Sequence, residues 1–154
     1  MLAVMTDAVE LHQAVQRLHA TYADVVTRRE WGELDELFAP GATVHVDTVT
    51  RPTVDLDGAA GLAEFVSSAL ERFSFFALVP LNSVAQPAGT EAATGRLWMV
   101  ELRQDAATGE WSEAYGRYDD RYAFVDGQWR YAARRYRSLA RRQGLSPADV
   151  FPPG

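Results

Sequence analysis

The sequence predicts a single α+β domain in which helices pack on one face of a curved, mostly antiparallel sheet. Apolar residues recur at three- and four-residue spacing in the first half of the chain, and they alternate with polar residues after Pro80. Helices followed by a run of strands are typical of the α+β class. The length of 154 residues fits one domain. We expect that domain to span residues 1–143, with an irregular tail over 144–154 that contains three prolines.

Three helices are predicted in the first half. The first covers residues 8–29 and is amphipathic, and a shorter one covers 30–38 until Ala39-Pro40-Gly41 stops it. Residues 42–50 alternate and indicate a strand. Asp57 and Gly58 then open a third helix whose apolar stripe reaches Phe73.

Three long strands are predicted in the second half, over residues 90–103, 111–125 and 128–139. Asp126-Gly127 between the last two is typical of a tight hairpin turn. Long, twisted strands with helices on one face form a cone around an interior pocket.

Several function classes are excluded by composition. The absence of Cys removes a thiol nucleophile and cysteine-ligated metals, and the absence of Lys removes Schiff-base catalysis. A net charge of −6 argues against a nucleic-acid partner. No apolar run is long enough to span a membrane, and residues 1–10 lack the basic start of a signal peptide, so we expect a cytoplasmic protein.

One basic segment departs from that average. Residues 130–142 contain six arginines and no acid. Such a segment can bind an anion, or its arginines can lie on a solvent-exposed face and form ion pairs with acidic residues elsewhere in the chain.

Two blocks carry a resemblance to a known family. The first runs from Tyr22-Ala23 through Arg28-Arg29-Glu30-Trp31 to Leu37-Phe38-Ala39-Pro40. The second has the form G-x-Y-x-D-x-Y over residues 116–122, followed by Asp126-Gly127-Gln128-Trp129. Together they resemble the SnoaL-like branch of the NTF2-like superfamily. The resemblance implies a cone-shaped α+β barrel with an apolar pocket, commonly assembled into oligomers. Its members include polyketide cyclases, dehydratases, dehydrochlorinases, ketosteroid isomerases and non-catalytic binders.

The resemblance also shows what this chain lacks. The acid–base Asp of the dehydratase and dehydrochlorinase members aligns with Thr27, and their His aligns with Leu78. A further His of the scytalone-type dehydratases aligns with Leu97. The Asp–His machinery is therefore absent, and an enzyme built on this chain needs other groups.

Residues expected to bind the substrate are mostly apolar and aromatic. For Tyr22, Trp31 and Tyr118, ordinary core packing is the alternative. They are Tyr22, Trp31, Val44, Val46, Phe65, Leu78, Leu97, Met99 and Tyr118.

Glu101 is the preferred catalytic candidate because it shares its strand face with Leu97 and Met99. A carboxylate in an apolar cavity has a raised pKa and becomes a usable base near neutrality. The alternative is a strand-end Glu in solvent or paired with an Arg.

Asp120 is the second candidate. Pairing back from the hairpin turn sets Asp120 opposite Ala133, which brings Arg135 near it and turns Arg134 to the other face unless a bulge intervenes. Such an Arg partner would hold the pKa of Asp120 low, and a buried Asp–Arg pair is more often structural than catalytic.

His45 is the third candidate, although its parity is opposite to Val44 and Val46 and turns it away from the pocket. His12 and His19 are expected on the flank of the first helix, and two histidines without a third ligand make a poor metal site. We therefore expect no metal and no organic cofactor.

The sequence favours an enzyme of the cyclase, dehydratase or isomerase type that acts on an apolar or aromatic carbonyl compound by cofactor-free acid–base chemistry. The alternative is a non-catalytic ligand-binding or assembly protein on the same fold. In either case we expect a small-molecule ligand and a homo-oligomer joined through the outer face of the sheet.

Overall fold

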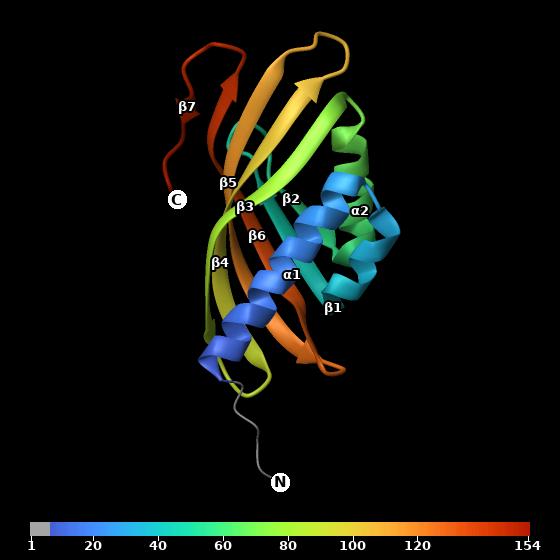
Figure 1. The fold of residues 1–154 in the computed structure, drawn as a ribbon, viewed down its shortest axis with the longest axis vertical. Coiled ribbons are helices and arrows are strands. Elements are labelled where there is room, and N and C mark those ends of the chain that lie inside the picture. Colours follow the sequence, from blue (N-terminus) through green and yellow to red (C-terminus); the bar gives the residue numbers. More distant parts are fainter. Residues whose placement is uncertain (1–6) are drawn as a thin grey trace.

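A computed structural model describes residues 7–154. The start of the predicted domain 1–143, and most of the segment judged for a signal peptide, lie outside the described residues. Three helices lie on one face of a strongly curved sheet (Figure 1). The predicted α+β class and the helix-covered, mostly antiparallel sheet are confirmed.

The first helix, α1 (Ala8–Arg28), begins where the Asp7 side chain accepts a hydrogen bond from the amide of Val9. It ends at Arg29, which adopts a left-handed conformation. The buried side of α1 carries Leu11, Val15, Val25 and Val26. This stripe packs the helix across the concave face of the sheet (Figure 1).

Two shorter helical elements follow. The segment predicted as a helix over 30–38 is a 3-10 helix, η1 (Trp31–Leu37), and α2 (Gly58–Leu70) is the predicted third helix. Ala39-Pro40-Gly41 was expected to end a helix but lies inside strand β1 (Phe38–Asp47), which therefore starts earlier than predicted. A four-residue strand that we did not predict, β2 (Val54–Asp57), pairs with β1.

Four long strands build most of the sheet: β3 (Phe73–Pro87), β4 (Ala92–Asp105), β5 (Trp111–Val125) and β6 (Gln128–Gln143). β3 is a fourth long strand where the sequence pattern predicts three, and its first residue, Phe73, was expected at the end of the third helix. The strand order is β2-β1-β6-β5-β4-β3, and among the strand pairs within residues 7–154 only β1 and β6 run parallel. Asp126 and Gly127 both have positive φ, as the predicted tight hairpin turn requires. The tail, expected to be irregular, contains the two-residue strand β7 (Asp149–Val150), which pairs with β6.

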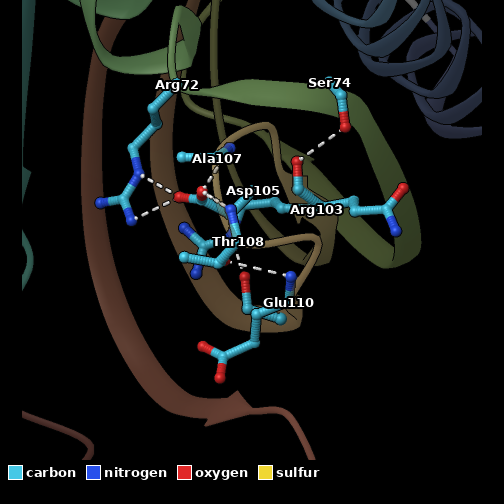
Figure 2. Close-up of polar contacts among 9 residues, drawn as sticks. Arg72, Ser74, Arg103, Asp105, Ala107, Thr108 and Glu110 are labelled. Carbon is cyan, nitrogen blue, oxygen red and sulfur yellow. Dashed lines mark hydrogen bonds and ion pairs between the residues drawn. The ribbon is translucent and has the colours of Figure 1, made fainter.

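The hairpin between β4 and β5 is hydrogen-bonded to Arg72, the residue that precedes β3 (Figure 2). The carboxylate of Asp105 accepts hydrogen bonds from Arg72, at 2.9 Å for its Nη2, and from the amides of Ala107 and Thr108. These contacts, with Arg72 the largest cause, lower the pKa of Asp105 to about 2. The charge of Arg72 is thus matched at this hairpin.

One apolar core fills the space between the helices and the sheet. It extends from the buried stripe of α1 to inner-face residues of β1, β3, β4, β5 and β6. Within residues 7–154, no helix combines the length and the apolar character needed to cross a membrane.

Candidate active site

An ion pair lies at the centre of the inner face. Arg134 donates from Nε to Asp120 Oδ1 at 2.8 Å and from Nη2 to Oδ2 at 3.1 Å, and both side chains are fully buried. The Arg134 guanidinium also lies 3.7 Å from the ring centroid of Tyr118 and 3.9 Å from that of Tyr131. Its charge is therefore held by a carboxylate and by aromatic faces.

The partner of Asp120 differs from the expected one. Tyr122 faces Tyr131 as the turn predicts, but Arg121 then faces Ala133, so Ala132 is an extra residue on β6. This bulge turns Arg134 inward and leaves Arg135 exposed on the outer face. The expected lowering of the Asp120 pKa is also wrong. Burial raises it, and the Arg134 guanidinium only opposes that rise.

His19 joins the same network from α1. We expected it on the flank of the helix, but it is only 2% exposed. Its Nδ1 lies 2.7 Å from the Tyr131 hydroxyl, and its Nε2 lies 3.1 Å from the Tyr122 hydroxyl. The Tyr122 hydroxyl donates to Asp120, so its oxygen accepts from Nε2–H, and Nδ1 accepts from Tyr131. Burial, with a smaller contribution from the charge of Arg134, lowers the pKa of His19 to about 3.

Glu101 occupies the inner face of β4, closer to the β4–β5 hairpin. Its side chain is 22% exposed to solvent. Its Oε2 lies 3.6 Å from Arg103 Nη1, and this distance is too long for a hydrogen bond. Burial raises the pKa of Glu101, while the charges of Arg103 and Arg141 oppose the rise. This carboxylate is therefore partly buried, reachable, and not held in a hydrogen-bonded ion pair.

Tyrosine hydroxyls lie within the electrostatic reach of Glu101. Burial, followed by the charge of Glu101, raises the pKa of Tyr136. The charge of Glu101 also contributes, after burial, to the raised pKa values of Tyr22 and Tyr118. The Tyr136 ring can lie against β5 only because residue 116 is Gly, since a Cβ there would come within 2.2 Å of the ring. Phenol donors thus accompany the carboxylate on one face.

Residues expected to bind the substrate all meet in the interior. Two of them, Trp31 and Phe65, are partly buried against the core cluster. The other seven are buried members of that cluster: Tyr22, Val44, Val46, Leu78, Leu97, Met99 and Tyr118. Here these side chains pack against one another.

His45 lies on the opposite, helix-free face of the sheet, as its parity predicts. Its Nδ1 is 2.7 Å from Asp55 Oδ1, and it is part of the lining of a groove of about 960 Å³. Arg121 and Arg135 lie across that groove from Asp55 and Asp57. The structure therefore separates His45 from Glu101 and Asp120, which share the inner face.

Thr27 and Leu78, at which the resemblance places an acid–base pair, are neighbours in space. The Leu78 amide donates to Thr27 Oγ1 at 3.0 Å. Within residues 7–154, no cluster of three or more His, Cys, Asp or Glu side chains could hold a metal ion.

The structure is an α+β domain whose helices cover a curved sheet and whose inner face carries a cluster of buried polar side chains. The chain belongs to the SnoaL-like domain family, whose model matches residues 7–135. A search of curated proteins finds no match.

Solved structures share the fold at low identity. A protein from Novosphingobium aromaticivorans, provisionally named a scytalone dehydratase, superposes with a TM-score of 0.78 at 19% identity, and 95% of each chain is covered. The hexachlorocyclohexane dehydrochlorinase LinA-type3 from Novosphingobium barchaimii gives 0.76 at 18% identity, covering 94% of this chain and 97% of that one. Rv3472 from Mycobacterium tuberculosis, a protein of unknown function, gives 0.69 at 24% identity, covering 82% and 70%.

Sequence reasoning missed three residues of the inner face. His19 and Arg134 complete the central network, and Arg141 lies near Glu101. The spacing of His19 from Leu18 and Tyr22 allowed an inward orientation, but nothing local indicated partners more than a hundred residues away.

Proposed function

We propose that the chain is a small-molecule enzyme of the cyclase, dehydratase or isomerase type that moves a proton next to the carbonyl of an apolar or aromatic substrate. The environment of Glu101 carries the proposal. This carboxylate is on the inner face, is partly buried, has a raised pKa and lacks a hydrogen-bonded cation. The named activities of two relatives, a dehydratase and a dehydrochlorinase, support a reaction that starts with removal of a proton.

Glu101 would act as the general base. Its raised pKa brings it closer to neutrality, where a carboxylate removes a proton from carbon most effectively. The electron pair left by the C–H bond moves onto the carbonyl oxygen. A hydroxyl of Tyr22, Tyr118 or Tyr136 can donate a hydrogen bond to that oxygen as negative charge develops. Glu101 then returns the proton at another carbon, or the electron pair expels a leaving group.

Asp120 is a poorer base despite its position. Both of its oxygens accept hydrogen bonds from Arg134, and one accepts a further bond from Tyr122. Taking up a proton would disrupt this buried pair, which makes a structural role the better interpretation.

Exchange of carbon-bound protons tests the proposal without knowledge of the natural substrate. We propose to follow 2-tetralone, an aromatic ketone with acidic protons next to its carbonyl, by proton NMR in D₂O. The proposal expects exchange faster than with an equal concentration of heat-denatured protein. Rates equal to the denatured control for 2-tetralone and for a panel of similar ketones would argue against an enzyme.

A second candidate is a non-catalytic binding protein on the same fold. The packing of Tyr22, Leu97, Met99 and Tyr118 against one another in the interior favours it, because a closed core leaves less room for a substrate. Saturable binding of 2-tetralone without proton exchange would support this second candidate.

A further inference from the structure

A row of four residues crosses the sheet at the level of Glu101. Leu78, Glu101, Ala114 and Arg141 stand directly opposite one another on β3, β4, β5 and β6. Opposed residues of antiparallel strands point to the same face, so Glu101 and Arg141 share the inner face. Only the buried methyl of Ala114 stands between them, and a separation of two strands places their Cα atoms about 10 Å apart.

Arg103 adds a second guanidinium to this row. Its Nε donates to Ser112 Oγ at 3.2 Å, and its guanidinium lies 5.1 Å from the Phe73 ring centroid. Its side chain is only 15% exposed, and Glu101 at 3.6 Å is the one carboxylate within ion-pair distance among residues 7–154. Arg103 is thus held in place while its charge is incompletely matched.

Charges around the row do not balance. Arg103 and Arg141 face a single carboxylate, Glu101, which leaves one positive charge in excess. Arg72 lies nearby but is matched by Asp105 (Figure 2). Asp149 is opposite Arg141 in register, yet no carboxylate of the described chain lies within 4.0 Å of Arg141, whose Nη1 donates to Thr50 Oγ1. A partly buried excess charge favours binding of a counter-ion.

We propose that Arg103 and Arg141 bind the carboxylate of an apolar, monoanionic ligand whose body lies along Leu78 and Phe76, the apolar residues of β3 opposite Glu101 and Arg103. The inference rests on the proposed function, since it names the substrate class of the same site. One excess positive charge matches a monoanion, whereas a phosphate dianion would leave a negative charge unmatched. Guanidinium groups suit carboxylates because their planar donors can pair with both oxygens.

Ligand binding then acts on Glu101. The charges of the two arginines lower the pKa of Glu101, while burial raises it. A bound carboxylate offsets the arginines and leaves the effect of burial, so the pKa of Glu101 rises on binding. At a pH near this raised pKa, part of the population therefore takes up a proton when the anion binds, and not when a neutral analogue of the same shape binds. The chains in which Glu101 stays ionised hold a stronger base.

Calorimetric titration of the full chain with 2-naphthoate and 2-naphthamide tests the inference. The two probes share an apolar body and differ in charge. We expect 2-naphthoate to bind at least tenfold more tightly and to take up protons, as measured in buffers of different ionisation enthalpy. Arg141→Gln and Arg103→Gln should each lower the ratio of the 2-naphthoate affinity to the 2-naphthamide affinity toward one. Neither variant should change the affinity for 2-naphthamide.

Two variants serve as matched controls. Arg142→Gln removes the next arginine, which pairs with Glu113 on the outer face, and should keep the wild-type preference. Asp149→Asn should also keep the wild-type preference for 2-naphthoate. A gain in 2-naphthoate affinity in this variant would identify Asp149 as the counter-ion of Arg141 and overturn the inference. Arg103→Lys replaces Arg103→Gln if circular dichroism shows that the latter is unfolded, and it should still weaken the preference.

The outcomes separate this inference from the proposed function. Equal affinity for the two probes overturns the carboxylate site but leaves proton exchange on 2-tetralone intact. Failure of both probes to bind at millimolar concentration overturns the inference, and absence of exchange as well overturns the proposed function.

Discussion

The backbone amide of Leu78 donates a hydrogen bond to the hydroxyl of Thr27 across the interface between α1 and β3, at 3.0 Å. The resemblance to dehydratases and dehydrochlorinases places an acid–base pair at these two positions. The proximity of the two residues supports that alignment. In this chain the hydrogen bond between these two residues links α1 to β3. The candidate acid–base group, Glu101, lies on the neighbouring strand, directly opposite Leu78.

Replacing Thr27 tests the structural role of this contact. Thr27→Val keeps the side-chain volume and leaves the Leu78 amide without an acceptor, which should lower the free energy of unfolding by about 1–3 kcal/mol. Urea unfolding measures the change. Thr27→Ser should retain most of the stability, and Thr21→Ala, which removes an exposed hydroxyl of the same helix, should cost much less. Equal stability of Thr27→Val and the wild type would contradict the role.

The Asp120–Arg134 pair should be essential for stability. Asp120→Asn leaves a fully buried guanidinium without its carboxylate and should cost about 3–5 kcal/mol of unfolding free energy. Asp119→Asn removes the neighbouring carboxylate, whose ion pairs with Arg96 and Arg117 lie near the surface, and should cost about 1 kcal/mol or less. If Asp120→Asn abolished proton exchange without loss of stability, Asp120 would be the catalytic base instead of Glu101.

His19 should make stability fall in mild acid. Its pKa is about 3 in the folded chain and about 6.5 when unfolded, so the unfolded state binds the extra proton between these values. Stability is full above pH 6.5 and declines as the pH falls toward 3. Between pH 6 and 4.5, unfolding free energy should fall by about 2 kcal/mol more in the wild type than in His19→Gln.

A histidine outside the network provides the control for that measurement. His12→Gln alters the same helix and should keep the wild-type slope of stability against pH. Identical slopes for the wild type and His19→Gln would mean that His19 is not held neutral in the folded chain.

We further propose that the helix-free face of the sheet joins two copies of the chain. Exposed Arg121 and Arg135 lie across the groove from Asp55 and Asp57, so a two-fold arrangement can match opposite charges. Sedimentation at micromolar concentration should show at least twice the 17.1 kDa of one chain. The double change Arg121→Glu and Arg135→Glu should shift the sedimenting species toward the monomer. Arg51→Glu, which changes an exposed arginine that does not line the groove, should leave the sedimentation unchanged. A wild-type species of 17.1 kDa alone would contradict the proposal.

Local patterns predicted most of the fold. The apolar spacing located α1, and the Asp126-Gly127 turn located the end of β5 and the start of β6, to within a residue or two, because helix periodicity and turn chemistry are local properties. The far end of β6 extends four residues beyond the prediction. β3 was missed as a separate strand, because Phe73 fits both the end of a helical stripe and the start of a strand and because strand-like alternation was recognised only after Pro80. β2 was missed because four residues give too little alternation to detect.

The candidate site was less predictable because strand bulges decide which arginine faces inward. Ala132 is an extra residue that turns Arg134 inward, and the irregular register near Leu139 sets Arg141 opposite Ala114. The extra residues on β6, Ala132 and Leu139, are not glycines and gave no local signal, although the second irregularity lies beside Gly116 of β5. Glu101 could be placed on the inner face because β4 keeps its alternation from Gly95 through Leu97 and Met99.

Comparison of Glu101→Gln with the wild type in the 2-tetralone exchange assay tests the central claim most directly. The amide keeps the shape of the side chain but cannot take up a proton, so the exchange rate should fall by roughly 10²–10⁴-fold with the unfolding free energy preserved. The wild-type rate should rise with pH through the raised pKa of Glu101, and Glu91→Gln, at the far end of the sheet, should leave the rate unchanged. A Glu101→Gln variant that is folded and exchanges protons as fast as the wild type would contradict the assignment of Glu101 as the base.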